Sequence, residues 1–175
     1  MEPSEVQVDQ EKLNLITVGR MEKEKRYDLI LQAAKLMKER GTKFHWYLVG
    51  GGPLLEELQT ISHRQNIDQD VTFTGELKNP YPLMKQCNAL VLMSDYEGTP
   101  VTIDEAKVLG LPVASRDVGG VRDQLEGGYG DIVQGRCFEL ERIVEHSAAQ
   151  SRIVYKKIAE QQKIVEQQLE MLFEL

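Results

Sequence analysis

The stretch "LNLITVGRMEKEKRYDLILQAAKLMKERGTKFHWYLVGGGP" (13–53) contains a complete strand–helix–strand unit. The runs 13–18 and 44–49 are short and apolar, and each is followed directly by glycine, as is typical of buried strands. The segment between them has helical spacing, with apolar residues at Ile30, Ala33, Ala34 and Met37. Because a helix joins the two strands, the unit predicts that they lie parallel in one sheet.

The same alternation continues along the chain. We expect helices over 54–65, 81–87 and 100–109, and strands over 71–75, 89–93, 112–115 and 130–133. The strands are nearly continuous apolar runs, as expected when helices cover both faces of a sheet. The pattern therefore predicts an α/β fold: a single Rossmann-like, doubly wound parallel sheet of about six strands with helices on both faces.

The chain divides into three predicted parts. Residues 1–12 are a polar lead, and 13–150 form the Rossmann-like domain. Residues 151–175 are rich in Gln and Glu, with apolar residues roughly on one face, and we expect a long terminal helix there.

Composition excludes several classes of partner. The 175 residues carry a net charge of −7, have no basic stripe and contain only 6% aromatic residues, which argues against nucleic acid and anionic membranes. No apolar run approaches the ~20 residues of a membrane span. The two cysteines, Cys87 and Cys137, form no CxxC or metal pattern, and no other metal-ligand cluster is evident. We expect reduced thiols, no metal, and a cytoplasmic protein, with a peripheral membrane location of the full-length protein left open.

Charged residues follow the first predicted strand in "VGRMEKEKRYD" (18–28). Gly19 ends the strand, and Arg20 and Lys25 could both reach an anion held over the strand ends, Arg20 as a bidentate fork and Lys25 as a point charge. Ligands of such sheets bind in the crevice beyond these ends. The alternative is a solvated charged turn.

The turn "VGGGP" (49–53) precedes the next helix. It lacks the third glycine of a dinucleotide fingerprint, since Leu55 occupies that position, and it lacks the Gly-Lys-Ser/Thr of a P-loop. We expect Pro53 at the first helical position and free N–H groups around it. A simple tight strand-to-helix turn explains the pattern at least as well.

The stretch "SDYEGTPVTIDEAKVLGLPV" (94–113) carries two glutamates eight positions apart. Glu97 follows a strand, and we expect Thr99 to cap a helix that begins at Pro100. Glu105 lies about five residues into that helix, and helical side chains lean toward the N-terminus, so we expect it to point toward the same opening as Glu97. Two carboxylates beside an anion pocket suit a nucleotide sugar. A capped helix with a surface glutamate is the equally supported alternative.

Four segments together resemble the C-terminal half of the glycosyltransferase family 4 enzymes. They are "VGRMEKEKRYDLILQA", "YLVGGGPLLEEL", "VTFTG" and "SDYEGTPVTIDEAKVLGLPVASRDVGG". Their order and spacing match from about Leu13 to Val133. The resemblance implies a retaining transferase with the two-domain GT-B fold, of which this chain is the nucleotide-sugar-binding domain.

The resemblance also implies roles for charged residues. Arg20 and Lys25 match the pair that holds the donor diphosphate. Glu97 and Glu105 match the E-x7-E signature, in which the first glutamate faces the donor sugar and the second binds the ribose hydroxyls. We assign Glu97, Arg20 and Lys25 as catalytic and Glu105 as substrate-binding.

The other matches are largely backbone positions around the donor. Gly19 ends the first strand, Gly51, Gly52 and Pro53 match the turn near the nucleotide, Gly75, Glu76 and Leu77 match the backbone that borders the base, and Gly98, Thr99, Pro100 and Val101 match the turn at the sugar and phosphate. In such enzymes cations and helix ends stabilise the departing nucleoside diphosphate, and a metal is not normally required.

The resemblance begins with the second domain's first strand, so we expect the acceptor-binding N-terminal domain to be absent from this chain. The resemblance therefore implies a hexosyltransferase half that binds a UDP-, GDP- or ADP-sugar and is inactive alone. The acceptor is a glycan, a lipid or another hydroxyl compound. Two alternatives remain: a GT-B nucleotide-sugar epimerase domain, and a non-catalytic nucleotide-binding or interaction module.

Overall fold

The computed structural model describes residues 8–133. Its strands are β1 (Leu13–Val18), β2 (Phe44–Val49), β3 (Val71–Gly75), β4 (Ala89–Leu92), β5 (Val113–Arg116) and β6 (Gly130–Val133). Its helices are η2 (Lys23–Lys25, a 3-10 helix), α1 (Tyr27–Glu39), α2 (Leu55–Arg64), α3 (Tyr81–Met84), α4 (Val101–Leu109) and α5 (Val121–Leu125). The predicted terminal helix (151–175) and the end of the predicted domain (134–150) lie outside the described residues.

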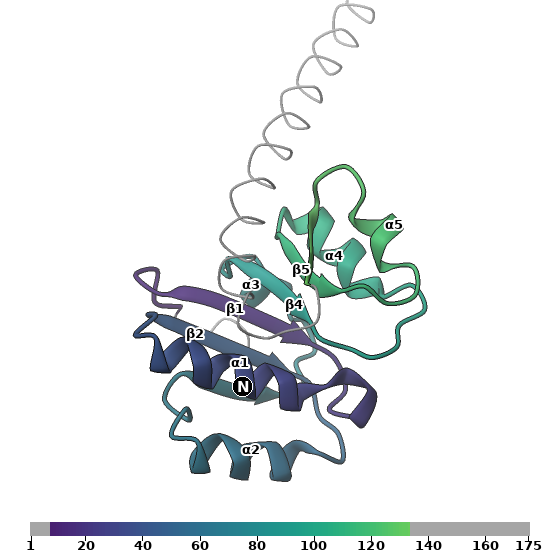
Figure 1. Ribbon diagram of the computed structural model, residues 1–175. Coiled ribbons are helices and arrows are strands. Elements are labelled where there is room, and N and C mark those ends of the chain that lie inside the picture. The colour runs from purple at the N-terminus through teal and green to yellow at the C-terminus, as the bar shows by residue number, and fades with distance from the viewer. Residues whose placement is uncertain (1–7, 134–175) are drawn as a thin grey trace, which may run out of the picture.

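The six strands form one parallel sheet in the order β3-β2-β1-β4-β5-β6 (Figure 1). β1 pairs with β2 over its whole length, and with β4 through Leu15↔Ala89 and Ile16↔Leu90. The chain order runs outward from β1 on one side and outward from β4 on the other. This confirms the predicted fold class, and it places the reversal of strand order, where such sheets bind ligands, between β1 and β4.

Helices cover both faces of the sheet (Figure 1). Along β2, Trp46 and Leu48 pack in one apolar cluster with residues of α1 and α2, whereas Tyr47 and Val49 pack in a second cluster with residues of α3, α4 and α5. Successive side chains of a strand point to opposite faces, so a strand buried on both faces is apolar at most of its positions. This is why the strands read as continuous apolar runs.

Two short elements, η2 and α5, were not predicted. Each is one turn or little more, too short for a helical period to show in the sequence. The predicted helix over 81–87 is shorter in the structure, where α3 ends at Met84. The other predicted helices and strands are present, with ends that differ by at most one residue.

Candidate functional site

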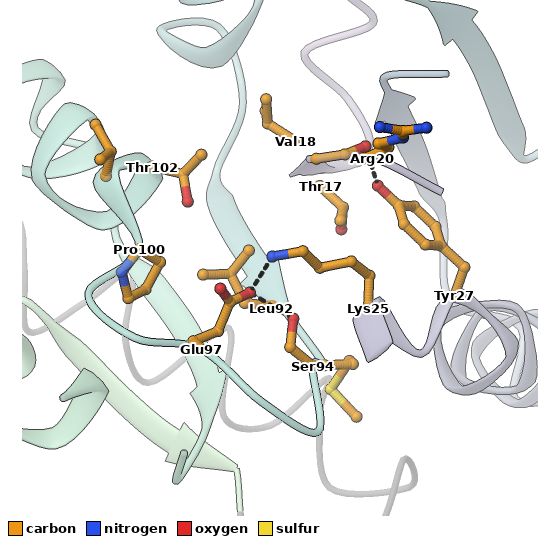
Figure 2. Close-up of a pocket in the computed structure, with 13 residues that line it drawn as sticks. Thr17, Val18, Arg20, Lys25, Tyr27, Leu92, Ser94, Glu97, Pro100 and Thr102 are labelled. Carbon is orange, nitrogen blue, oxygen red and sulfur yellow. Dashed lines mark hydrogen bonds and ion pairs between the residues drawn. The ribbon is translucent and has the colours of Figure 1, made fainter. Parts of the chain in front are cut away.

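A cavity of about 350 Å³ opens where the strand order reverses (Figure 2). We call it the central pocket, and its walls come from the ends of β1 and β4, the loops after them, and the first turn of α4. It is lined by Thr17, Val18, Gly19, Arg20, Lys25, Tyr27, Leu92, Met93, Ser94, Glu97, Pro100, Val101 and Thr102. The structure therefore brings together six residues that the sequence nominated: Gly19, Arg20, Lys25, Glu97, Pro100 and Val101.

Lys25 and Glu97 form an ion pair in the wall of the central pocket. Lys25 Nζ lies 2.6 Å from Glu97 Oε1, and Ser94 Oγ donates a hydrogen bond to the same oxygen at 2.7 Å (Figure 2). The Glu97 side chain is only 10% exposed and that of Lys25 is 32% exposed. A carboxylate this buried needs partners, and the second partner, Ser94, was missed from the sequence. Its position two residues after β4, at the carboxyl edge of the sheet, was the available signal.

The loop after β1 begins at a fixed backbone position. Tyr27, the first residue of α1, is buried, and its hydroxyl donates to the carbonyl oxygen of Gly19 at 2.8 Å. Burial raises the pKa of Tyr27.

The two cations that line the pocket differ in exposure. The Arg20 side chain is 70% exposed, and its Nε lies 2.8 Å from Glu22 Oε1. The pocket thus holds one largely sheltered cation, Lys25, and one solvated cation at its rim.

The first turn of α4 closes the opposite side of the pocket. The helix begins at Val101, and Pro100 is the N-cap with φ −66° and ψ 113°. The prediction that Thr99 caps a helix starting at Pro100 is therefore wrong by one residue. The proline ring fixes φ but leaves ψ free, so Pro100 can be extended and stay outside the helix. The positive end of the α4 dipole nevertheless faces the pocket.

Glu105 lies one turn further along α4 and does not line the central pocket. Its Oε1 accepts a hydrogen bond from the Tyr81 hydroxyl at 2.7 Å, which raises the pKa of Tyr81. The two side chains line an open groove of about 380 Å³ between α3 and α4. The expectation that Glu105 points into the same opening as Glu97 is thus corrected, because the Tyr81 hydroxyl draws its carboxylate toward α3.

The glycine turn (50–53) supports the loop after β1 instead of lining the central pocket. The Gly51 carbonyl accepts the Met21 N–H at 2.7 Å. Gly52 has φ +146°, and a Cβ there would lie 2.6 Å from the Met21 carbonyl oxygen. Pro53 lies two residues before α2, so its predicted place as the first helical residue is wrong. The turn permits a close approach of two backbone segments.

The backbone after β3 joins this turn at the same edge. The Gly75 carbonyl accepts the Gly50 N–H at 2.9 Å. The Glu76 carboxylate lies beside Gly51, and a Cβ added at Gly51 would lie 3.2 Å from Glu76 Oε1. Leu77 is partly buried and packs against the second apolar cluster. None of the segment 75–77 belongs to the lining of the central pocket.

A glycine pair holds the turn that follows Glu97. The Gly120 N–H donates to the Gly98 carbonyl at 3.1 Å. Gly119 has φ +51°, and a Cβ there would lie 1.8 Å from the Glu97 carbonyl oxygen. Gly98 and Thr99 therefore contact this pair instead of lining the central pocket. The sequence showed the two glycines after a strand but not what they touch.

Other chemistry is limited in the described part of the chain. Across residues 8–133, no group of three or more His, Cys, Asp and Glu side chains is arranged to hold a metal ion. No helix in that range is long and apolar enough to cross a membrane. Cys87 is a free thiol, and burial raises its pKa to about 12. Few Cys87 side chains are thiolates near neutral pH, so this thiol is a poor nucleophile.

Comparison with known sequences places the chain among glycosyltransferases. It is 33% identical over 117 residues to the putative glycosyltransferase EpsF of Bacillus subtilis (strain 168), an alignment that covers 67% of this chain and 30% of that protein. It is 29% identical over 121 residues to the alpha-D-kanosaminyltransferase of Streptomyces kanamyceticus, covering 68% and 31%. The chain thus spans about a third of the length of these relatives.

Solved structures show the same fold. TarM of S. aureus, solved with fondaparinux, alpha-GlcNAc-glycerol and UDP, superposes with a TM-score of 0.73 at 20% identity, covering 92% of this chain and 35% of that one. Anabaena HepE in complex with UDP-glucose gives 0.71 at 23% identity, covering 94% and 49%. The sheet corresponds to one Rossmann-like half of GT-B glycosyltransferases. The profile of the family described as "Glycosyl transferases group 1" matches residues 2–169, and the chain belongs to this family.

Proposed function

We propose that the chain is the donor-binding half of a retaining, family 4 glycosyltransferase that moves a hexosyl group from a nucleoside-diphosphate sugar to an acceptor. The observation that carries this proposal is the Lys25–Glu97 pair, which places a cation and a carboxylate at 2.6 Å in a pocket at the reversal of strand order. The cation, Lys25, can bind a phosphate group, and the carboxylate, Glu97, can accept hydrogen bonds from sugar hydroxyls.

The diphosphate would lie between the loop after β1 and the first turn of α4. Lys25 and Arg20 offer positive charge from one side, and the helix end at Val101 offers it from the other. These groups would stabilise the negative charge that develops on the departing nucleoside diphosphate. We therefore propose that the reaction needs no divalent metal.

The donor sugar would face Glu97. Lys25 and Ser94 both bind Oε1, so these two contacts leave Oε2 as an acceptor for a sugar hydroxyl. The nucleoside would extend along α4 toward Glu105, which lies about 6 Å further along the helix axis. There the Glu105 carboxylate would accept the ribose hydroxyls, and the segment 75–77 would border the base.

Transfer would need a second domain that binds the acceptor, be it a glycan, a lipid or another hydroxyl compound. The chain spans 30% to 49% of the relatives and solved structures described above. In the proposed arrangement the acceptor approaches from the side of the pocket that this chain leaves open. The isolated chain should therefore bind the donor without transferring its sugar.

Titration calorimetry tests the donor-binding role. The 175-residue chain is titrated with UDP, GDP and ADP, and with the corresponding monophosphates. We expect at least one diphosphate to bind, about tenfold more tightly than its monophosphate, and Lys25→Ala to weaken it about tenfold. Lys35→Ala is the matched control, since Lys35 forms an exposed ion pair with Glu39 on α1. Absence of binding by all three diphosphates, or an unaffected Lys25→Ala, would refute the proposal.

The retaining mechanism is tested on the full-length protein. Proton NMR of the first-formed product gives the configuration of the new glycosidic bond relative to the donor. Retained configuration is expected, and an inverted product would contradict this part of the proposal. An epimerised nucleotide sugar without transfer would instead identify the epimerase alternative.

A further inference from the structure

The two sides of the central pocket come from segments that follow two neighbouring strands of the sheet. Lys25 lies in the loop after β1, and Glu97 lies in the loop after β4. The backbone register between these strands pairs Leu15 with Ala89 and Ile16 with Leu90, near the start of β4. Beyond this point the two loops project from neighbouring strands on opposite sides of the switch point. Direct contacts between the two segments therefore contribute to the distance from Lys25 to Glu97.

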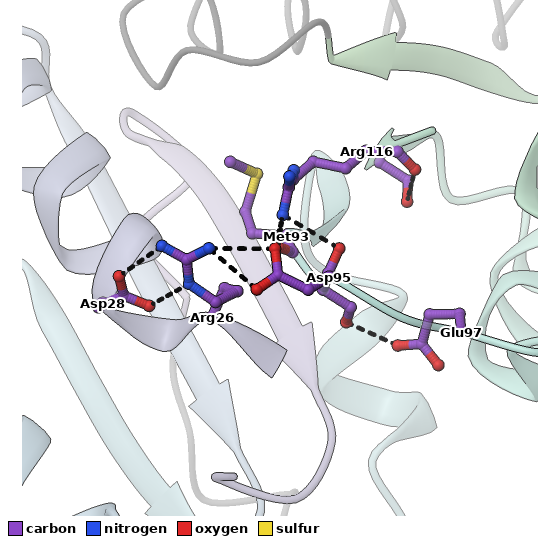
Figure 3. A network of polar contacts seen from close by, with 8 residues as sticks. Arg26, Asp28, Met93, Asp95, Glu97 and Arg116 are labelled. Carbon is purple, nitrogen blue, oxygen red and sulfur yellow. Dashed lines mark hydrogen bonds and ion pairs between the residues drawn. The ribbon is translucent and has the colours of Figure 1, made fainter. Parts of the chain in front are cut away.

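Asp95 makes these contacts on both sides of Lys25. Its backbone N–H donates to the Glu24 carbonyl at 2.8 Å. Its carboxylate oxygens each accept a hydrogen bond from Arg26 Nη1 at 3.0 Å (Figure 3). Glu24 and Arg26 are the chain neighbours of Lys25, and Asp95 precedes Glu97 by two residues. The residue thus ties the segment that carries the cation to the segment that carries the carboxylate.

Each side of this contact is anchored to a regular element. Arg26 uses its remaining edge for a bidentate pair with Asp28, in the first turn of α1, at 2.9 and 3.0 Å (Figure 3). Arg116, at the end of β5, donates from Nη1 to Asp95 and to the carbonyl oxygens of Met93 and Ser94. Hydrogen bonds from Arg116 and Arg26 lower the pKa of Asp95, so it stays ionised at neutral pH.

The backbone of Arg26 also fits this arrangement. Arg26 has φ +51° and ψ +45°, a left-handed conformation that is uncommon for a residue with a side chain. In this conformation it forms the junction between η2 and α1 and brings its guanidinium to Asp95. Asp95 and Arg26 do not line the central pocket, so neither is placed to touch a ligand there.

We propose that Asp95 is a positioning residue: by clamping Glu24 and Arg26, it holds Lys25 opposite Glu97 and so sets the anion affinity of a pocket that it does not line. The inference rests on the proposed function for the identity of the anion, and on the contacts of Asp95 alone for the clamp. Because the Asp95 side chain is 46% exposed, its ion pairs contribute little to global stability.

The test compares Asp95→Ala with Asp117→Ala. Asp117 is an equally matched control, since its side chain is also 46% exposed and pairs with an arginine, Arg122, near the same edge of the sheet. Each variant of the 175-residue chain is titrated with the nucleoside diphosphate, among UDP, GDP and ADP, that the unsubstituted chain binds most tightly. We expect Asp95→Ala to bind about tenfold more weakly and Asp117→Ala to bind normally. Arg26→Ala removes the same ion pair from its other side and should weaken binding in the same direction.

A double-mutant cycle separates positioning from general destabilisation. If Asp95 acts through Lys25, Asp95→Ala should cost little further affinity in a Lys25→Ala background. An additive loss, or an equal loss in Asp117→Ala, would overturn the inference.

Amide hydrogen exchange provides a readout that needs no nucleotide. In Asp95→Ala the amides of residues 21–27 and 94–98 should exchange faster, while those of α2 keep the rate of the unsubstituted chain. Unchanged exchange in both loops would overturn the clamp even if nucleotides bind. If no nucleotide binds but exchange rises as expected, the clamp stands and the proposed function fails.

Discussion

The amino group of Lys25 and the carboxylate of Glu97 are 2.6 Å apart, although 72 positions separate them in the chain. Parallel strands β1 and β4 end side by side, so the loops that follow them meet over the same edge of the sheet. Glu97 is therefore the counter-ion of Lys25, the more sheltered of the two cations that line the pocket. A bound diphosphate has to share Lys25 with this carboxylate.

Glu97→Gln should tighten the binding of a nucleoside diphosphate. The amide keeps the size of the side chain but removes the negative charge that competes with phosphate for Lys25. We expect a gain of about threefold for the diphosphate, measured by titration calorimetry, together with loss of sugar transfer in the full-length protein. Glu56→Gln, at an exposed position of α2 outside the lining of the central pocket, removes the same charge and should leave affinity unchanged. Weaker binding by Glu97→Gln would contradict the counter-ion role.

Gly119→Ala should disturb the turn that carries Glu97. A Cβ at Gly119 would lie 1.8 Å from the Glu97 carbonyl oxygen, so one of the two backbones must move. We expect a loss of about 2–3 kcal/mol in the free energy of unfolding, measured by urea denaturation, and weaker nucleotide binding. Gly41→Ala is the matched control, because Gly41 also has a positive φ, +77°, but has nothing within 4 Å of a new Cβ. It should cost only about 1 kcal/mol. Equal losses in the two variants would show that the contact with Glu97 carries no cost.

Tyr81→Phe should weaken recognition of the ribose. The Tyr81 hydroxyl donates to Glu105 at 2.7 Å and fixes the carboxylate that we propose binds the ribose hydroxyls. We expect about threefold weaker binding of the nucleoside diphosphate and no change for its 2′,3′-dideoxy form, which lacks both hydroxyls. Tyr96→Phe is the control, since Tyr96 is 74% exposed next to Glu97. An equal loss for both ligands would show that Tyr81 does not act through the ribose.

Alkaline pH should destabilise the fold through Tyr27. Burial raises the pKa of this phenol above the ordinary value of about 10, and its hydroxyl must stay protonated to donate to Gly19. Below about pH 10 the contribution of Tyr27 to stability is therefore complete. As the pH rises further, the unfolded chain releases this proton first, and stability falls by up to about 1.4 kcal/mol per pH unit from this group.

Urea denaturation between about pH 9 and about pH 11, which brackets the ordinary tyrosine pKa, measures this effect. Tyr27→Phe should remove its part of the slope. The residual slope belongs to other groups with raised pKa values, including Tyr47 and Cys87. An identical slope in Tyr27→Phe and the unsubstituted chain would rule out the assignment to Tyr27.

The spacing of apolar residues along the sequence was sufficient to predict the architecture. The apolar runs of β1, β2, β4 and β5 and the helical spacing of α1 predicted a parallel sheet covered on both faces, and the structure confirms it. The same logic placed Arg20, Lys25 and Glu97 at one edge, because carboxyl ends of parallel strands share an edge. The ends of elements were less predictable, as Thr99 and Pro53 show, since a cap depends on one or two backbone dihedrals that composition does not specify.

The fold class, the edge at which the site lies and three of its charged residues were thus predictable without coordinates, because they follow from residue periodicity and strand ends. The partner that each of those residues binds depends instead on how the loops fold and pack in three dimensions. The pair of Lys25 with Glu97 and the clamp from Asp95 to Arg26 join segments about 70 positions apart in the chain. The contacts of Ser94 with Glu97 and of Tyr27 with Gly19 are local, but they depend on loop conformations that the sequence pattern does not specify. Glu105 shows why such partners cannot be predicted from sequence spacing. A carboxylate binds the nearest suitable donor in space, here the Tyr81 hydroxyl on another helix, and the distance between two helices is set by packing, not by spacing along the sequence.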